Sequence, residues 1–283
     1  MEQTIQQAAV ALADEAIDLS RSLDDGARAV GTSGILIAEG DSWFAYPGTN
    51  LIKELKRLGF RIESNAENGS LLEDMAYSKD RLADLHGRMR EAQQEWAEIP
   101  RAILLSGGGN DIVNEPLLAM LNHAAAGEPA LDPQMVEAMI DVRLANAIRS
   151  WIASVQRLVA DVWGEGVRVP VVMHGYDYPV PDGRGYKKIG VTWRGPWMQP
   201  DFHARGFDDL GQSRDLIAIL ITRYNDMVAR LASTEQGLNL RYANLLNTLS
   251  SDLSNYKDSW DNELHPEKEP FRLLADRLVR VIP

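Results

Sequence analysis

Four residues of this chain follow strand-like runs or precede its last helical stretch, and their types suit acyl transfer. Ser42 comes directly after an apolar run, Gly69 and Asn110 come after two further runs, and His265 lies near the C-terminus. A serine hydroxyl is a poor nucleophile until a neighbouring base, most often histidine, removes its proton. The tetrahedral intermediate then needs N–H donors for its negative oxygen. The four residues could therefore supply a nucleophile, a base and an oxyanion hole.

The surroundings of Ser42 also have a simpler interpretation. It lies in the sequence EGDSW at 39–43, and Gly, Asp and Ser are common in plain turns. Polar and glycine residues also follow the next two apolar runs and precede the last helix, which favours the catalytic interpretation. These segments are 65–69 (NAENG), 107–111 (GGGND) and 260–266 (WDNELHP).

Together these short blocks resemble the SGNH (GDSL-like) hydrolase family, named for its Ser, Gly, Asn and His. Gly40-Asp41-Ser42 matches the first block, with Trp43 where leucine is more usual. Gly69 matches the second block, 108–111 (GGND) the third, and His265-Pro266 the last. Each block is short, so their joint occurrence in the family's order carries the resemblance.

The resemblance implies a role for each of these residues. Ser42 would be the nucleophile, and His265 the general base that later protonates the leaving group. The oxyanion hole would consist of the backbone N–H of Ser42, the backbone N–H of Gly69 and the side-chain NH2 of Asn110. Glycine suits position 69 because the backbone itself must approach the substrate.

The sequence leaves open which residue orients His265. The family's last block has aspartate three residues before the histidine, and this chain has Asn262 there. An amide oxygen can accept the imidazole N–H but has no charge, whereas Asp261 has the charge but lies one position away. Asp177, after the fourth apolar run, is a weaker candidate, and a backbone carbonyl could hold the ring of a Ser-His dyad. Asn262 and Asp261 remain equal alternatives.

The apolar pattern predicts an α/β protein. Five short, nearly continuous apolar runs are typical of parallel strands covered on both faces, and amphipathic stretches lie between them. The runs are 34–39, 60–64, 101–106, 168–174 and 238–243, and the clearest helical stretches are 144–162, 217–231 and 271–282. Alternating strands and helices with right-handed crossovers form a parallel sheet between two helical layers. We therefore expect a three-layer α/β/α sandwich, the flavodoxin-like SGNH hydrolase fold, with about five parallel strands.

We expect a single domain over residues 1–283 with two additions to the basic fold. Residues 1–29 are Ala-rich and amphipathic, which predicts an N-terminal helical extension. Residues 175–209 form a long insertion without a clear period, and such loops in compact domains are usually functional or disordered. Several aromatic residues in this insertion argue against disorder, so we expect it to act as a lid or pocket wall.

Trp43, His174 and Tyr176 are expected to line the substrate pocket, although a hydrogen-bonded structural histidine explains His174 equally well. No His, Asp or Glu cluster has metal-ligand spacing. The glycines at 107–109 lack the following Lys-Ser or Lys-Thr of a phosphate-binding loop. We therefore expect no metal and no cofactor.

Composition narrows the class of partner. The net charge is −12, from 29 basic and 41 acidic residues, and an acidic surface repels nucleic acid and anionic lipid. Cysteine is absent, the N-terminus lacks the basic region of a secretory signal, and no apolar run approaches the roughly 18 residues of a membrane span. We expect a cytoplasmic enzyme with a small-molecule ester substrate and no nucleic-acid or membrane partner. A homo-oligomer is left open.

The expected reaction is hydrolysis of small or short-chain carboxylic esters through an acyl-serine intermediate. An acyl-carbohydrate deacetylase is the alternative enzyme. A non-catalytic ligand-binding protein with the SGNH fold is an alternative of another class, because the charged member of the triad is missing from its usual position.

Overall fold

The computed structural model describes residues 33–188 and 191–283. Gly34–Pro283 form one compact unit. The N-terminal helical extension predicted over residues 1–29 lies outside the described residues. Among the helices of the described part, none is both long enough and apolar enough to cross a membrane.

The central element is a five-stranded parallel sheet, as the apolar runs predict. Its strands are β1 (Ile35–Gly40), β2 (Arg61–Ser64), β3 (Ala102–Ser106), β4 (Val171–His174) and β7 (Leu240–Ala243). They lie in the order β2-β1-β3-β4-β7, and all neighbouring pairs are parallel. Counting only the strands of this sheet, the order is the 2-1-3-4-5 of flavodoxin-like folds. The ligand crevice of such a sheet is expected between the carboxyl ends of its first and third strands, here β1 and β3.

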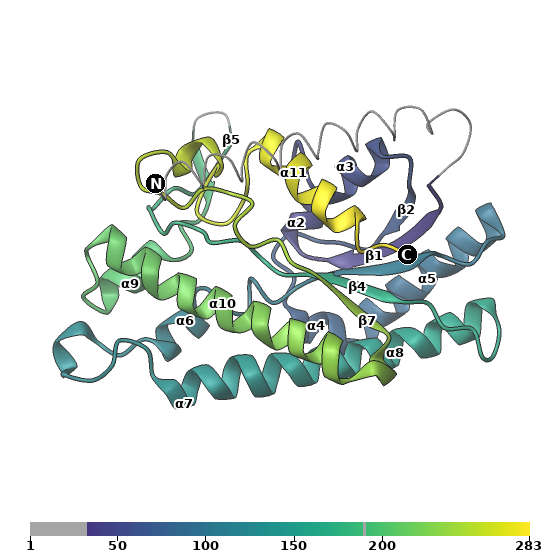
Figure 1. Ribbon diagram of the computed structural model, residues 1–283, viewed down its shortest axis with the longest axis horizontal. Coiled ribbons are helices and arrows are strands. Elements are labelled where there is room, and N and C mark those ends of the chain that lie inside the picture. Colours follow the sequence, from purple (N-terminus) through teal and green to yellow (C-terminus); the bar gives the residue numbers. More distant parts are fainter. Residues whose placement is uncertain (1–32, 189–190) are drawn as a thin grey trace, which may run out of the picture. The chain divides into compact units, whose positions relative to one another are not determined.

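Helices cover both faces of the sheet (Figure 1), so the three-layer prediction is confirmed. One layer contains α2 (Ser42–Ala45), α3 (Leu51–Arg57) and α11 (Lys268–Val279). The other contains α4 (Leu72–Tyr77), α5 (Lys79–Trp96), α8 (Ala145–Trp163) and α10 (Leu210–Thr234). The shorter helices are α6 (Glu115–Met120), α7 (Pro133–Val136), a π-helical segment (Glu137–Leu144) that continues into α8, and 3-10 turns at Ala124–Ala126, Gln236–Leu238 and Tyr256–Asp258.

The longest helices form where an apolar stripe faces the sheet. Ile148, Trp151 and Val155 of α8 are buried, at the helical spacing that the sequence shows. Helix α10 begins at Asp209, whose side chain accepts the N–H of Gln212. Such a cap contributes about 1 kcal/mol to helix stability.

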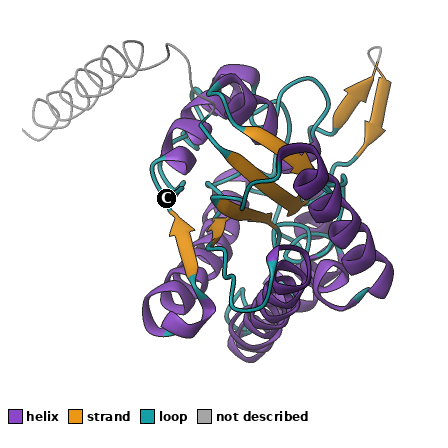
Figure 2. Cartoon of the chain, turned by 90° about the vertical axis from the view of Figure 1, so that its right-hand side faces the viewer, coloured by secondary structure: helices purple, strands orange, loops and turns teal. Residues whose placement is uncertain are grey.

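Residues 175–209 contain regular structure that the sequence pattern does not indicate. β5 (Tyr186–Lys188) and β6 (Val191–Arg194) form an antiparallel hairpin, and α9 (Gln199–Ala204) follows it. Strands of three and four residues are too short to show a hydrophobic period. Figure 2 shows this hairpin standing out from the body of the domain.

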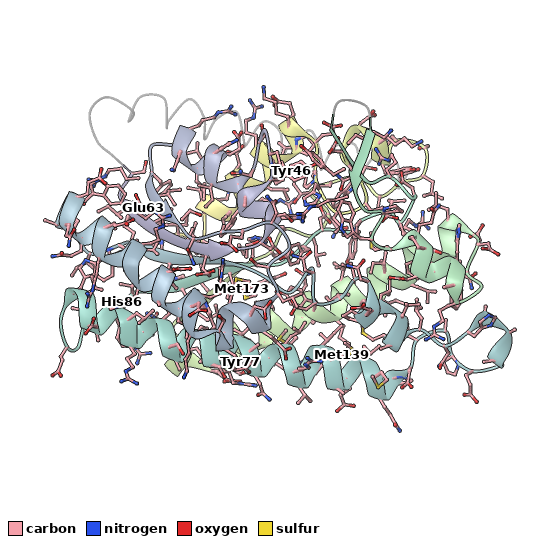
Figure 3. The ribbon with its side chains drawn as sticks, turned by 180° about the vertical axis from the view of Figure 1, so that it is seen from behind. Tyr46, Glu63, Tyr77, His86, Met139 and Met173 are labelled. Atoms are coloured by element: carbon pink, nitrogen blue, oxygen red, sulfur yellow. The ribbon has the colours of Figure 1, made fainter. Side chains whose placement is uncertain are left out.

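The side chains between the layers form one core. Figure 3 shows Met173 of β4 among them, and this residue is fully buried, whereas Tyr77 at the end of α4 is exposed. All residues of β1, β3 and β4 are buried, because helices cover both faces of these strands. The core thereby holds the carboxyl ends of β1 and β3 side by side.

Candidate active site

Ser42 is the first residue of α2, directly after the turn that ends β1. The turn requires glycine at position 40, because a Cβ there would lie 2.7 Å from the Cβ of Ser106. Asp41 holds the turn: its Oδ1 accepts the N–H of Trp43 at 2.9 Å and the hydroxyl of Ser106 at 2.7 Å. Strand, turn and helix thus place the hydroxyl of Ser42 at the carboxyl edge of the sheet.

The fold brings Ser42 and His265 together although 223 positions separate them in the chain. Nε2 of His265 lies 2.7 Å from Oγ of Ser42. The exposed fractions of the two residues are 8% for Ser42 and 4% for His265. This separation is within the range that a general base needs to take the proton of a nucleophile.

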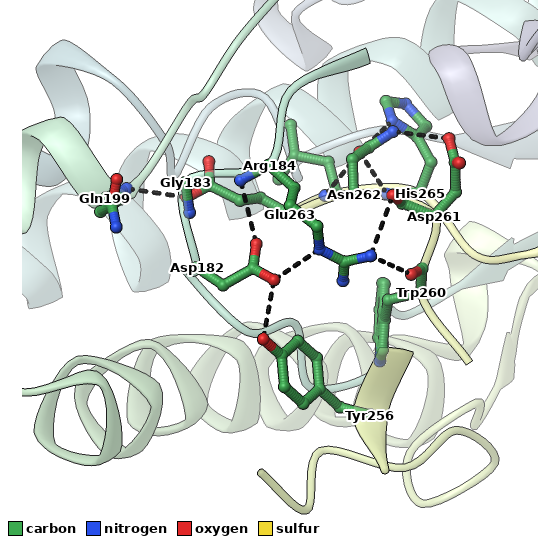
Figure 4. A network of polar contacts seen from close by, with 11 residues as sticks. Asp182, Gly183, Arg184, Gln199, Tyr256, Trp260, Asp261, Asn262, Glu263 and His265 are labelled. Carbon is green, nitrogen blue, oxygen red and sulfur yellow. Dashed lines mark hydrogen bonds and ion pairs between the residues drawn. The ribbon is translucent and has the colours of Figure 1, made fainter. Parts of the chain in front are cut away.

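Asn262, and not Asp261, contacts the other imidazole nitrogen. Oδ1 of Asn262 lies 2.9 Å from Nδ1 of His265, and it also accepts the backbone N–H groups of Leu264 and His265. The NH2 group of Asn262 donates to the carboxylate of Asp261 at 3.0 Å and to the hydroxyl of Tyr46 at 2.9 Å. Because the donor side of the amide has these partners, its oxygen faces His265. Figure 4 shows Asn262 between Asp261 and His265.

The amide oxygen of Asn262 determines the tautomer of His265. An amide oxygen can only accept a hydrogen bond, so Nδ1 of the neutral ring carries the hydrogen. Nε2 is therefore unprotonated, and the hydroxyl of Ser42 donates to it. Asn262 thus orients the imidazole as the third member of a triad would, without supplying a negative charge.

Burial lowers the pKa of His265 from 6.5 to about 3. The partner of Nδ1 is a neutral amide, so no negative charge at that position offsets the desolvation of the imidazolium. The unprotonated ring, which is the form that can act as a base, therefore predominates above about pH 3.

Tyr46 lies against His265 and is a residue that the motifs do not identify. Its ring stacks on the imidazole with centroids 4.0 Å apart and planes 12° apart. Its hydroxyl donates to Asp261 at 2.5 Å and accepts from Asn262. Tyr46 is four residues after Ser42, a spacing that places two side chains on one face of a helical turn, and this is the signal in the sequence that could have identified it.

The predicted oxyanion donors surround the cavity into which Ser42 opens. Gly69 has a φ of +83°, and a Cβ there would meet no atom within 4 Å. This conformation is one that glycine adopts without strain, and it leaves the backbone exposed to the cavity. The side chain of Asn110 donates one hydrogen to the carbonyl of Ser70 at 3.0 Å, which leaves the second hydrogen for a ligand.

Asp111, next to Asn110, ties this part of the site to α4. Its Oδ2 accepts the N–H of Leu72 at 2.9 Å. Leu71 occupies the N-cap position of α4 and has no side-chain hydrogen bond to offer, so Asp111 caps the helix from another loop. Burial raises the pKa of Asp111 to about 6.

Two cavities meet at Ser42. The open cavity has a volume of about 280 Å³ and the inner cavity about 30 Å³. The open cavity is lined by Ser42, Tyr46, Pro47, Asn68, Gly69, Asn110, Tyr186, Arg194, Trp197, Leu264 and His265. The inner cavity is lined by Asp41, Ser42, Trp43, Gly109, Asn110, Val113, Tyr176, Asp177, Pro179, Met198, Ile217, Ile221, Trp260 and Leu264. The open cavity therefore contains all four residues that the motifs single out.

The three residues expected to line the substrate pocket have different positions. Trp43 and Tyr176 line the inner cavity. The expectation for His174 is wrong: it is fully buried, stacks on the ring of Trp43 at 5.5 Å, and its Nδ1 lies 2.7 Å from the carbonyl oxygen of Gly175. The reason is that Trp43 covers the end of β4, so the histidine lies beneath the pocket wall.

Asp177 was the weaker candidate for the residue that orients His265, and its hydrogen-bond partners lie elsewhere. Its carboxylate accepts the backbone N–H groups of Tyr178, Asn247, Thr248 and Leu249 at 2.6–2.9 Å. It therefore fixes the loop after β7 and makes no contact with His265.

Glu263 is a second residue that the motifs do not identify. This fully buried carboxylate accepts four backbone N–H groups, those of Gly183, Trp197, Met198 and Gln199, at 2.5–3.0 Å. Figure 4 shows the contacts of this region. Since Gly183 and Trp197 flank the β5–β6 hairpin, one side chain two positions before His265 holds both ends of the hairpin.

Within residues 33–188 and 191–283, no group of three or more His, Asp or Glu side chains is placed to hold a metal ion. The polar groups in the lining of the open cavity are hydroxyl, amide and imidazole groups and one guanidinium, that of Arg194.

Comparison with known proteins finds similar solved structures. No family model matches the chain, and no curated protein matches it. Similar solved structures include a member of the lipolytic G-D-S-L family from Veillonella parvula, with 14% identity, 87% of this chain and 97% of that chain covered, and a TM-score of 0.44. A protein from Slackia heliotrinireducens named as an SGNH hydrolase has 13% identity, 89% and 100% coverage and a TM-score of 0.48. A catalytic mutant of an acetylxylan esterase from Geobacillus stearothermophilus has 14% identity, 89% and 95% coverage and a TM-score of 0.42. At this degree of likeness, function has to be argued from the geometry around Ser42.

Proposed function

We propose that this protein is a serine esterase that hydrolyses carboxylic esters with a short acyl group. The observation that carries the proposal is the 2.7 Å contact between Nε2 of His265 and Oγ of Ser42 at the wall of an open cavity. Gly69 and Asn110 line the same cavity. These residues together are the nucleophile, the base and the oxyanion donors that acyl transfer requires.

In the acylation step, Oγ of Ser42 attacks the ester carbonyl carbon, and its proton passes to Nε2 of His265. The negative oxygen of the intermediate accepts hydrogen bonds from the backbone N–H groups of Ser42 and Gly69 and from the side-chain NH2 of Asn110. The intermediate then expels the alcohol, which takes the proton from His265. Water repeats the sequence on the acyl-serine, releasing the acid and restoring the hydroxyl. Losing one oxyanion donor typically costs about 3–4 kcal/mol of barrier.

The two cavities differ in which part of the ester they suit. His265 must protonate the leaving oxygen, and it lines the open cavity but not the inner one. The leaving group therefore belongs in the open cavity, and the acyl group points toward the inner one. At about 30 Å³ against about 280 Å³, the inner cavity is the smaller of the two, which favours a short acyl group.

Hydrolysis of p-nitrophenyl acetate and p-nitrophenyl butyrate tests this function. We expect release of p-nitrophenol that Ser42→Ala abolishes, and a kcat/KM at least about tenfold higher for the acetate, because the small inner cavity favours the shorter acyl chain. No release above the Ser42→Ala level from either ester would contradict the esterase and favour a ligand-binding protein. An equal or higher kcat/KM for the butyrate would contradict the short-acyl assignment alone.

One observation favours an acyl-carbohydrate deacetylase as the second candidate. Tyr186 and Trp197 place two aromatic side chains in the lining of the open cavity, with Asn68 as a polar neighbour. Aromatic faces and amide groups suit the apolar face and hydroxyls of a sugar ring. A kcat/KM for an acetylated methyl glycoside that exceeds the value for a simple alkyl acetate would select this candidate.

A further inference from the structure

The open cavity beside Ser42 has one permanently charged side chain in its lining, that of Arg194. His265 is neutral above about pH 3, and the remaining lining residues are polar, aromatic or aliphatic. Arg194 is exposed at the end of β6, and its guanidinium has no hydrogen-bond or ion-pair partner within the part of the chain that the structure describes. A guanidinium that faces a substrate cavity without a carboxylate partner is available to a ligand.

The charge around Arg194 is the reverse of the charge of the whole chain. Residues 183–200 include four basic residues and no acidic residue, in a protein with a net charge of −12. One of the four, Arg184, forms an ion pair with the carboxylate of Asp182 and donates to the carbonyl of Trp260. Another, Arg194, lines the open cavity, where its positive charge can attract an anion.

The position of Arg194 relative to the catalytic residues is held by Glu263. This carboxylate accepts the N–H of Gly183 at 3.0 Å and the N–H of Trp197 at 2.5 Å, on either side of the hairpin. Arg194 lies three residues before Trp197, and Glu263 lies two residues before His265. The hairpin and the histidine loop are therefore joined by a buried anchor, which keeps the backbone next to Arg194 close to the loop that carries His265.

We propose that Arg194 binds an anionic group, a carboxylate or a phosphate, on the leaving-group side of the ester. This inference rests on the proposed esterase function and names the class of its substrate. The planar guanidinium can form two parallel hydrogen bonds to either anion. The leaving-group side is assigned because Arg194 and His265 line the same cavity.

A pair of aryl acetates that differ in charge tests the proposal. The substrates are 4-acetoxybenzoate, which is anionic, and 4-acetoxybenzamide, which is neutral and of similar shape. We expect Arg194→Met to lower the kcat/KM ratio of the anionic to the neutral ester by about tenfold, mainly through KM, and Arg194→Glu to lower it further. Comparing ratios between variants removes the difference in intrinsic reactivity of the two esters. The matched control is Lys187→Glu, which reverses a charge on the same hairpin at an exposed residue outside the cavity lining and should change the ratio little.

An unchanged ratio in both Arg194 variants would overturn the proposal, as would a fall in the ratio of equal size in Lys187→Glu. Calorimetric binding of the products, 4-hydroxybenzoate and 4-hydroxybenzamide, to the Ser42→Ala protein tests Arg194 without catalysis. We expect the anion to bind more tightly, and Arg194→Met to remove that preference; equal binding of the two products would contradict the proposal. If neither ester is cleaved but the protein still binds 4-hydroxybenzoate more tightly than 4-hydroxybenzamide, the proposed esterase function is wrong. The proposed anion site at Arg194 is then supported independently.

Discussion

At the scale of single residues, Asn262 has the most informative position in the site. It orients His265 through an amide oxygen, and its NH2 group is held by Asp261 and Tyr46. The negative charge of Asp261 is thus one side chain removed from the imidazole. Without a carboxylate hydrogen-bonded directly to it, the imidazole should have a lower pKa than in a Ser-His-Asp triad.

Exchanging the two side chains, in the double variant D261N/N262D, tests the effect of this missing charge. The exchange keeps the net charge and places a carboxylate at Nδ1 of His265, which raises the pKa of the imidazole by favouring its charged form. The wild-type kcat/KM should be constant between pH 8 and about pH 5, because the pKa of His265 is about 3. In the double variant, kcat/KM should decline across this range, with a midpoint near the ordinary histidine pKa of about 6.5. Superimposable pH profiles for p-nitrophenyl acetate would contradict this account.

A series of truncations ranks the residues that hold His265. Asn262→Ala removes the acceptor of the Nδ1 hydrogen and should lower kcat about a hundredfold or more, because the ring loses its tautomer and its orientation. Tyr46→Phe keeps the stacked ring but removes the hydroxyl. Asp261→Ala removes the carboxylate that accepts hydrogen bonds from Tyr46 and Asn262. Each of these should lower kcat about tenfold or less, since one hydrogen bond to the amide is lost. A loss of kcat in Asp261→Ala as large as that in Asn262→Ala would show that Asp261 is the working third member.

The residues that the motifs single out are those whose chemistry is visible in their type. Ser42, Gly69, Asn110 and His265 were predicted from short blocks, and the structure places them around one cavity. The choice between Asn262 and Asp261 depended on side-chain direction, which adjacent positions in a loop do not reveal. His174 was wrongly expected in the pocket because its strand-end position is visible in the sequence but the tryptophan that covers it is not.

At the scale of elements, Glu263 joins the β5–β6 hairpin to the loop that carries His265. Oε1 accepts two of its four N–H groups and Oε2 accepts the other two. In Glu263→Gln one oxygen becomes an NH2 group, so two buried N–H groups lose their acceptor. We expect the free energy of unfolding to fall by about 2–6 kcal/mol, at about 1–3 kcal/mol for each of the two unsatisfied groups.

Chemical denaturation and amide exchange measure this effect. Exchange should become faster at residues 197–199, and KM should rise because the hairpin lines the open cavity. The matched control is Glu267→Gln in the same loop, whose side chain is exposed and which should change the free energy by less than about 0.5 kcal/mol. Equal stability of Glu263→Gln and the wild type would refute the anchoring role.

The central strands β1, β3 and β4 were predictable because each is a nearly continuous apolar run that is buried on both faces. The hairpin was not, because its stability comes from contacts with distant residues rather than from its own pattern. Glu263 is the clearest case, since its function depends on backbone N–H groups about 65 to 80 positions away.

At the scale of the whole molecule, burying a neutral histidine makes stability depend on pH. The pKa of His265 is about 3 in the folded protein and about 6.5 in the unfolded chain. The unfolded state therefore takes up a proton first, and stability declines as the pH falls from about 6.5 toward 3. Between pH 6.5 and pH 4.5 this contribution is about 2–3 kcal/mol, at 1.36 kcal/mol per pH unit.

Comparing the wild type with His265→Gln isolates this contribution. Burial also raises the pKa of Glu39 to about 7 and of Asp111 to about 6. These carboxyls act in the opposite direction, because stability is lost as the pH rises through their folded pKa values, but they are present in both proteins and cancel in the difference. The wild type should therefore lose about 2–3 kcal/mol more than His265→Gln between pH 6.5 and pH 4.5. Parallel stability curves from urea denaturation would contradict the buried, neutral state of His265.

The net charge of −12 describes the whole chain and does not indicate where basic residues lie in the fold. The basic residues at 183–200 are visible in the sequence, but only the fold shows that one of them, Arg194, lines the open cavity. Overall charge therefore bears only on the expected class of partner, whereas the charge of Arg194 bears on the proposed substrate.

The central claim is that His265 activates Ser42 as a nucleophile, and labelling with a fluorophosphonate tests it most directly. The reagent phosphonylates an activated serine, so peptide mass spectrometry of the labelled protein reports both the stoichiometry and the site. We predict one label per chain on the peptide that contains Ser42, none in Ser42→Ala, and a rate reduced at least about a hundredfold in His265→Ala. A wild type that stays unlabelled, or a label carried equally by the Ser42→Ala protein, would contradict the account.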